Sequence, residues 1–338
     1  MKLAKNIFFY EGDYVEERKG YFNHYRGMGS SNYLVVCGEN CQVMIDTGMP
    51  HGPHKNRHKK ELSQDKIDLN KTTHIFFSHL HPDHVILAKE LSKKSGHQLK
   101  FLMHQDNENY AINADHAFED FFNLPEEIKK EILIFPSWLT KFYLKFIGMS
   151  YDYVRADHFF KDKDVYDIGT KIEIIELPAH CPGHVGYYFP DEKIFYSADL
   201  FDSRISSGAG IMVSNSSYDN AFKDIERIEN MDIAILVPGH GRAIYGKDNI
   251  KKTLSAVRKG TQDYLSKIVS CLPPEPALAL TLSSLTDLIF LDSISYNAYS
   301  RRMIIYNCLK YLQKNHQNVK FSFKKNKFFW FYVNNEIL

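Results

Sequence analysis

Long apolar runs and an excess of one charge are both missing from this sequence of 338 residues. No stretch of about 18 uncharged apolar residues occurs, so the sequence offers no candidate membrane span. The 42 Lys and Arg residues balance 41 Asp and Glu residues, and the net charge of +1 excludes a chain-wide field that would attract nucleic acid or an anionic membrane. The apolar patch at residues 7–10 is too short for a signal-peptide core, so we expect a cytoplasmic protein.

Cysteine is also scarce, with five scattered residues at positions 37, 41, 181, 271 and 308. An odd, scattered set argues against a disulfide framework and favours a reducing compartment. In contrast, 44% apolar residues and 14% aromatic residues supply ample material for a large core, and the length suggests about two domains. The unusual feature of the composition is its 16 histidines.

Apolar periodicity divides the chain into a β-rich part and a helical part. We expect strands at residues 32–36, 42–45, 73–78, 172–177, 186–189, 193–197 and 233–237, and a helix at 83–94. Residues 1–250 would form one domain, and residues 251–338 a second, in which helices precede a two-stranded ribbon as in a small winged-helix module.

Residues 105–160 interrupt the β-rich part with helical apolar spacing, so we expect a helical insertion there. Two interpretations remain open for it. The helices would either pack into the core or form a lid over an apolar substrate pocket lined by Trp138, Phe142 and Phe146.

A dense group of histidines follows the expected strand at 73–78. His79, His81, Asp83 and His84 lie within six residues, at the end of a strand and the start of a helix. Alternation along the strand end lets His79 and His81 point to the same side. Asp83 alone would be interpreted as a helix cap, and one histidine alone as a core residue. Together, imidazole and carboxylate groups at this spacing favour a site for zinc, or for iron or manganese.

Three later segments, each at the end of an expected strand, carry the same residue types. They contain His180 with His184, then Asp199, and last His240. With Asp46-Thr47-Gly48, these motifs resemble those of the metallo-β-lactamase-fold hydrolase superfamily, nearest its glyoxalase II-like (hydroxyacylglutathione hydrolase-like), thioesterase and lactonase branch, over roughly residues 30–245. The resemblance implies an α+β fold, a four-layer αβ/βα sandwich with metals at one edge of its two sheets.

The resemblance also implies a dinuclear metal centre. One divalent ion would be held by His79, His81 and His180, the second by Asp83, His84 and His240, and Asp199 would bridge the two. Zinc is the expected metal, with iron and manganese as alternatives, and a hydroxide would be available there at neutral pH.

Other residues have supporting roles in this interpretation. Asp83 would help to orient or deprotonate the attacking water, Asp46 would orient ligands, and His184 would support the site or line its pocket. Superfamily members with di-iron redox chemistry have Glu in place of His81, which favours hydrolysis here. Cys181 should point away from His180. The histidines at 51, 54 and 58 are expected in a solvated loop, with substrate contact as the alternative.

The motifs leave the substrate open. Ala198 stands where glyoxalase II-like enzymes usually have Gly, and Asp202 where quorum-quenching lactonases commonly have Tyr. We expect hydrolysis of an ester, thioester or lactone bond in a small acyl substrate. Two other functions remain open: a nuclease that binds its substrate through lysines of the tail, and a non-catalytic ligand sensor. The tail lysines are at positions 314, 320, 324, 325 and 327. The protein could also assemble as a homodimer.

Overall fold

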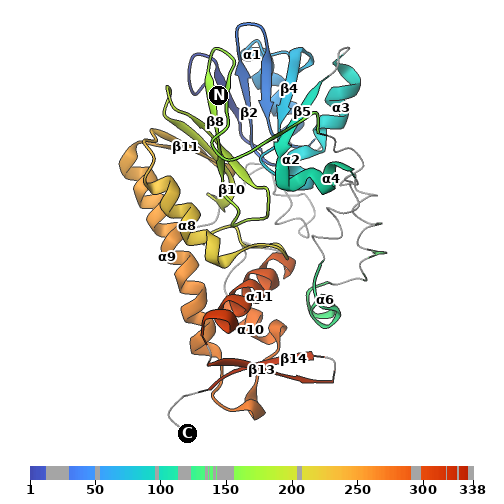
Figure 1. Cartoon of the computed structure of the whole chain (residues 1–338), viewed down its shortest axis with the longest axis vertical. Helices are drawn as coiled ribbons and strands as arrows, with labels where there is room; N and C mark the ends of the chain where they lie inside the picture. Colours follow the sequence, from blue (N-terminus) through green and yellow to red (C-terminus); the bar gives the residue numbers. More distant parts are fainter. Residues whose placement is uncertain are drawn as a thin grey trace.

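Two stacked β-sheets with helices on their outer faces form the upper part of the molecule in Figure 1, above the C-terminal helices. The computed structural model describes residues 1–12, 30–49, 54–95, 99–112, 123–133, 136, 138–139, 142, 156–203, 208–290, 298–316, 318–325 and 327–333. Within these ranges, no helix is both long and apolar enough to span a bilayer.

The first sheet has six strands in sequence order, antiparallel at first and then parallel. They are β1 (Ile7–Tyr10), β2 (Tyr33–Cys37), β3 (Gln42–Ile45), β4 (Thr72–Phe76), β5 (Lys100–His104) and β6 (His158–Phe160). The second sheet has the order β12-β11-β10-β9-β8-β7, in which only β10 and β11 pair in parallel. Its strands are β7 (Val165–Asp167), β8 (Lys171–Glu176), β9 (Val185–Phe189), β10 (Ile194–Asp202), β11 (Ile235–His240) and β12 (Ile244–Tyr245).

Strand β1 illustrates why both faces of the first sheet are buried. Ile7 and Phe9 face the second sheet, whereas Phe8 and Tyr10 face the outer helices, because successive side chains of a strand point to opposite faces. Two such faces need apolar residues at every position, which explains the continuous runs in the sequence.

Helices complete the outer layers. On the first sheet these are α1 (His54–Gln64), α2 (Pro82–Val85) and α3 (Leu87–Lys94). On the second sheet these are α8 (Tyr218–Glu229) and α9 (Lys247–Cys271). The expected four-layer α+β sandwich is thereby confirmed.

Several local expectations are corrected by the structure. The expected helix at 83–94 is divided at Ile86 into α2 and α3. Residues 158–160, assigned to the helical insertion, form strand β6 of the first sheet. His54 and His58 belong to helix α1 and are buried, with their Nε2 atoms hydrogen-bonded to the carbonyls of Met49 and Glu11, so they do not lie in a solvated loop. His51 lies outside the described residues.

The C-terminal part has the helices and ribbon that the sequence predicts. Helices α9, α10 (Leu282–Ile289) and α11 (Ala298–Asn315) precede the ribbon of β13 (Val319–Lys324) and β14 (Lys327–Tyr332). One continuous apolar cluster extends from Phe195 of the second sheet through these helices to Trp330 of the ribbon. The proposed domain division at residue 250 falls within helix α9, and both the division and the winged-helix classification stay predictions.

The described part of the insertion contains the 3-10 turn at Gln105–Asn107 and helices α4 (Glu108–Ile112) and α6 (Glu126–Ile132). Helix α6 packs on the C-terminal helices, where Glu131 accepts a hydrogen bond from the Ser283 amide at the start of α10. The Glu131 carbonyl also accepts one from Arg302 of α11. This helix is therefore core-packed.

Asn32, buried at the start of β2, connects the two sheets. Its Nδ2 donates to the carbonyls of Pro238 and Gly241, both at 2.8 Å, and its Oδ1 accepts from the Gly12 amide at 2.7 Å. Its backbone amide donates to Gly239. One side chain thus fixes the end of β11, where His240 lies, against the first sheet.

We expect Asn32→Leu to lower the free energy of unfolding by about 3 kcal/mol, because three buried polar groups lose their partner. Asn249→Leu is the control, since the Asn249 side chain makes one exposed hydrogen bond to Tyr245. Urea unfolding with chelator present measures both. A loss no larger than that of the control would contradict the role of Asn32.

Candidate metal centre

The strand ends bring the predicted residues to one edge of the sandwich. The segment with His79, His81, Asp83 and His84 follows β4 and begins α2. His180 follows β8, Asp199 lies in β10 and His240 ends β11. These three strands run in the same direction, because β9 is antiparallel to both β8 and β10 and β11 is parallel to β10. All seven side chains that the sequence singled out therefore meet.

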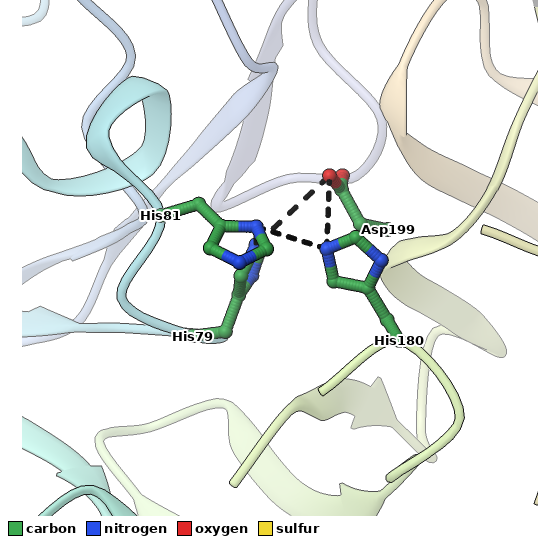
Figure 2. Close-up of side chains that lie close together, drawn as sticks. All are labelled: His79, His81, His180 and Asp199. Atoms are coloured by element: carbon green, nitrogen blue, oxygen red, sulfur yellow. Dashed lines mark hydrogen bonds and ion pairs between the residues drawn. The ribbon is translucent and has the colours of Figure 1, made fainter. Parts of the chain in front are cut away.

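The first cluster contains His79, His81, His180 and Asp199 (Figure 2). His81 Nδ1 lies 2.9 Å from both His79 Nε2 and His180 Nε2. Asp199 Oδ2 lies 3.9 Å from His79 Nε2 and 3.7 Å from His180 Nε2. Ligand atoms around a tetrahedral zinc with bonds of about 2.0–2.1 Å are about 3.3 Å apart, so these spacings suit a single cation.

The second cluster contains Asp83, His84 and His240. His240 Nε2 lies 3.1 Å and His84 Nε2 3.7 Å from Asp83 Oδ2. Asp199 also reaches this cluster, with 3.3 Å between its Oδ1 and His84 Nε2 and 3.6 Å between its Oδ2 and His240 Nε2. The Asp199 carboxylate thus lies between the two clusters.

Two buried atoms of this region fit a bound cation. His84 Nε2 and Asp199 Oδ1 have no hydrogen-bond partner among the described residues. An unpaired buried polar atom costs about 1–3 kcal/mol, more if it is charged, and a cation coordinated between the two would remove that cost.

Buried hydrogen bonds orient the rings. His84 Nδ1 donates to Asp46 Oδ2 at 2.7 Å, so Nε2 is the ring nitrogen that faces Asp83 and Asp199. The Ser78 hydroxyl donates to the same oxygen at 2.6 Å, so it accepts from His79 Nδ1. Tyr196 OH is a further donor to Asp46 Oδ2, at 2.7 Å. Asp46 thus orients His84 directly and His79 through Ser78, as expected for a residue that supports a metal site.

His184 and Cys181 are not available as ligands. The ring of His184 donates from Nδ1 to the Leu177 carbonyl and accepts at Nε2 from the Asp199 amide, so both nitrogens are used. It therefore supports the backbone of Asp199. Burial raises the pKa of the Cys181 thiol, and its sulfur lies in neither cluster of the described residues.

Burial and mutual repulsion keep the histidines of the first cluster neutral. Desolvation, then the neighbouring imidazoles, hold the pKa values of His79 and His81 well below the ordinary value. Desolvation acts the same way on His84, but Asp199, Asp46 and Asp83 outweigh it and raise the His84 pKa well above the ordinary value. Neutral imidazoles and ionised carboxylates are the forms that bind metals, so an ion bound at the second cluster would displace the proton that the three carboxylates favour on His84.

The backbone beside the shared carboxylate is strained. Ala198, before Asp199, has φ of +42°, a conformation that favours glycine. A glycine at this position would relieve the strain that alanine bears. Glycine is required at 239, where a Cβ would lie 2.1 Å from Asp199 Oδ1.

The predicted pocket residues are exposed where the structure describes them. Trp138 and Phe142 are 69% and 65% exposed, and Phe146 lies outside the described residues. Their contact with a substrate stays a prediction. Three supporting groups were not predicted from the sequence: Ser78, Tyr196 and the carbonyl of Gly210, which accepts from His180 Nδ1 at 2.5 Å. Of these three, only Ser78 could have been suspected from the sequence, because it directly precedes His79.

Comparison with known proteins identifies the family. The profile of the Metallo-beta-lactamase superfamily matches residues 26–240, and the chain belongs to this superfamily, whose members are generally metal-dependent hydrolases. A metallo-beta-lactamase family protein from Thermus thermophilus superposes with a TM-score of 0.74 at 13% identity, over 98% of this chain and 100% of that one.

Two further solved structures share the fold. A beta-lactamase domain protein from Burkholderia ambifaria has a TM-score of 0.67 at 12% identity, over 98% of this chain and 94% of that one. The subclass B3 metallo-beta-lactamase BJP-1 of Bradyrhizobium japonicum has a TM-score of 0.51 at 14% identity, over 79% and 93%. A search of curated proteins found no significant match.

Asp46→Asn should weaken metal binding by about 10- to 100-fold, because an amide cannot accept every hydrogen bond that orients His84 in one cluster and His79 in the other. Competition with a chromogenic chelator measures this affinity. Asp68→Asn is the control, since the Asp68 side chain accepts only from the exposed Asn70 amide. Equal affinities for the two variants would contradict the orienting role.

Asp224 on helix α8 should make stability depend on pH. Its carboxylate accepts from the Ala179 amide, beside His180, and burial raises its pKa to about 7. The folded protein therefore keeps a proton that the unfolded chain, with a pKa of about 3.9, releases. This stabilisation is complete below about pH 4 and is lost as the pH rises to about 7.

Asp224→Asn keeps an acceptor for Ala179 but does not titrate. The difference in unfolding free energy, variant minus parent, should grow by about 2–4 kcal/mol between pH 4 and pH 8. Urea unfolding across this range measures it. A difference that does not change with pH would refute the assignment.

Proposed function

We propose that the protein hydrolyses an ester, thioester or lactone bond of a small acyl substrate, with two divalent metal ions bound at the described clusters. The observation that carries this proposal is the arrangement of two buried clusters around one shared carboxylate, Asp199. His79, His81 and His180 are the proposed ligands of one ion. Asp83, His84 and His240 are those of the other. Zinc suits this nitrogen and oxygen set, and iron and manganese are its competitors.

Two such ions, when bound, would supply a hydroxide at neutral pH and polarise the substrate oxygen. The contribution of the chain itself centres on Asp83. Burial works against the charged form of Asp83, yet His84 and His240 hold its pKa below the ordinary value, so the group is a carboxylate at neutral pH. Its side chain is 16% exposed and can orient a water molecule or accept its proton.

The local charges favour a neutral acyl group over a phosphodiester. Among the described residues, Asp83 and Asp199 form ion pairs with histidines of the two clusters and with no lysine or arginine. The β13–β14 ribbon, whose strands contain Lys320, Lys324 and Lys327, lies at the lower end of the molecule in Figure 1, whereas α2 and β10 lie in the upper half. This separation also weakens the nuclease alternative. The complete ligand set argues against a non-catalytic sensor.

Asp83→Asn should lower kcat by about 100-fold or more and change KM little, because the group acts on the chemical step. Steady-state kinetics, with metal content determined on the same sample, test this. Equal changes in kcat and KM would assign Asp83 a structural role instead.

The substrate class can be tested through Trp138. If this exposed ring contacts an acyl chain, Trp138→Ala should lower kcat/KM about 10- to 100-fold for long-chain acyl esters and little for acetyl esters, since burial of such a side chain is worth about 1.5–3 kcal/mol. Phe323→Ala is the control, because this aromatic ring is also exposed but lies in the ribbon.

A panel of thioesters, lactones, phosphodiesters and RNA should be measured with these variants. If instead RNA is cleaved, and replacement of Lys324, Lys325 and Lys327 abolishes that cleavage, the acyl proposal is wrong and the nuclease alternative holds.

A further inference from the structure

The ring of His180 is oriented by a loop that joins β10 to α8. In this loop, the Gly210 carbonyl accepts from His180 Nδ1, and the Gly210 amide donates to Leu200 at 2.7 Å. A side chain cannot be accommodated at Gly210, where a Cβ would lie 2.2 Å from the Asp199 carbonyl oxygen. The loop backbone therefore lies directly against two candidate ligands, and its position decides where His180 Nε2 points.

Helix α11 of the C-terminal part fixes this loop. Asn307 is 2% exposed, and its Nδ2 donates to the carbonyls of Ile211 at 3.0 Å and Val213 at 2.8 Å. One turn further along the helix, Lys310 Nζ donates to the Ser214 carbonyl at 3.1 Å. Helix α11 thus holds three carbonyls of the loop, and the first of them belongs to the residue after Gly210.

Helix α9 holds the loop on the other side of Gly210. The Thr261 hydroxyl accepts from the Ala209 amide at 2.8 Å and donates to the Val257 carbonyl within its own helix. Ala209 and Ile211 are both fully buried, so water cannot readily replace these contacts. Gly210 is therefore fixed between hydrogen bonds from two helices.

The chemistry of Asn307 suits this position. A side-chain amide nitrogen carries two hydrogens, so Asn307 can donate to the carbonyls of Ile211 and Val213 at the same time. A leucine has the same size and no donor.

We propose that Asn307 is a positioning residue for the metal centre and acts on His180 through the loop at 208–216. The C-terminal helices are then part of the metal site and not a separate appendage. This inference rests on the proposed function, because it assigns His180 to the metal ion that His79 and His81 also bind.

The test compares metal binding by Asn307→Leu and Gln42→Leu. Gln42 is a matched control: it is a buried amide whose Nε2 also donates two hydrogen bonds, to Asp68 and Thr72, at the end of β3 away from Asp46. Zinc affinity is measured by competition with a chelator, and the ligand geometry by the electronic spectrum of the cobalt-substituted protein. Urea unfolding shows how far each variant is destabilised.

Asn307→Leu should weaken one of two zinc equivalents at least tenfold and change the cobalt spectrum, whereas Gln42→Leu should retain both equivalents and the parent spectrum. Unchanged affinity and spectrum in Asn307→Leu, or an equal loss in Gln42→Leu, would overturn the proposal. If Asn307→Leu does not fold, Thr261→Val replaces it, because Thr261 fixes the same loop at Ala209. Thr261→Val should also weaken zinc binding. Unchanged zinc affinity in this variant would overturn the proposal. If the parent protein binds fewer than two equivalents, the proposed function fails instead.

Discussion

The buried carboxylate of Asp46 is the interaction on which the rest of the site depends. It is fully buried and accepts four hydrogen bonds, from the Ser78 amide and hydroxyl, His84 and Tyr196. Tyr196 belongs to the second sheet and the other donors follow the first, so one charge links both sheets. A buried charge is tolerated only when it is fully hydrogen-bonded, so the positions of Ser78, His84 and Tyr196 around Asp46 are tightly constrained.

Around Asp46, buried carboxylates and imidazoles interact strongly because little water screens their charges. Asp46, Asp83 and Asp199 surround His84, while the imidazoles of His79 and His81 are kept neutral by burial. The strained backbone at Asp46 and Ala198, both at positive φ, lies at the same place. Such strain persists where the surrounding structure enforces it, and here two packed sheets do so. The arrangement is costly without a cation, and cations would compensate it.

The features that follow from short sequence segments, such as strands and the motifs at their ends, could be predicted from the sequence. Strand-end motifs predict a site because strands that run in the same direction end at the same edge, and the four segments around His79, His180, Asp199 and His240 meet as expected. Features that depend on contacts between distant segments were not predictable. Tyr196 is 150 positions from Asp46, and Asn307 is 94 positions from Val213. The break at Ile86 was missed because the apolar spacing continues through it.

Two metal ions sharing Asp199 are the central claim of this account. The most direct measurement is equilibrium dialysis of the purified protein against zinc, followed by elemental analysis, for the parent and for Asp199→Ala. The account predicts two zinc ions per chain in the parent and a loss of tight binding at both positions when the shared carboxylate is removed. Less than one zinc ion per parent chain, or two tightly bound ions in Asp199→Ala, would contradict it.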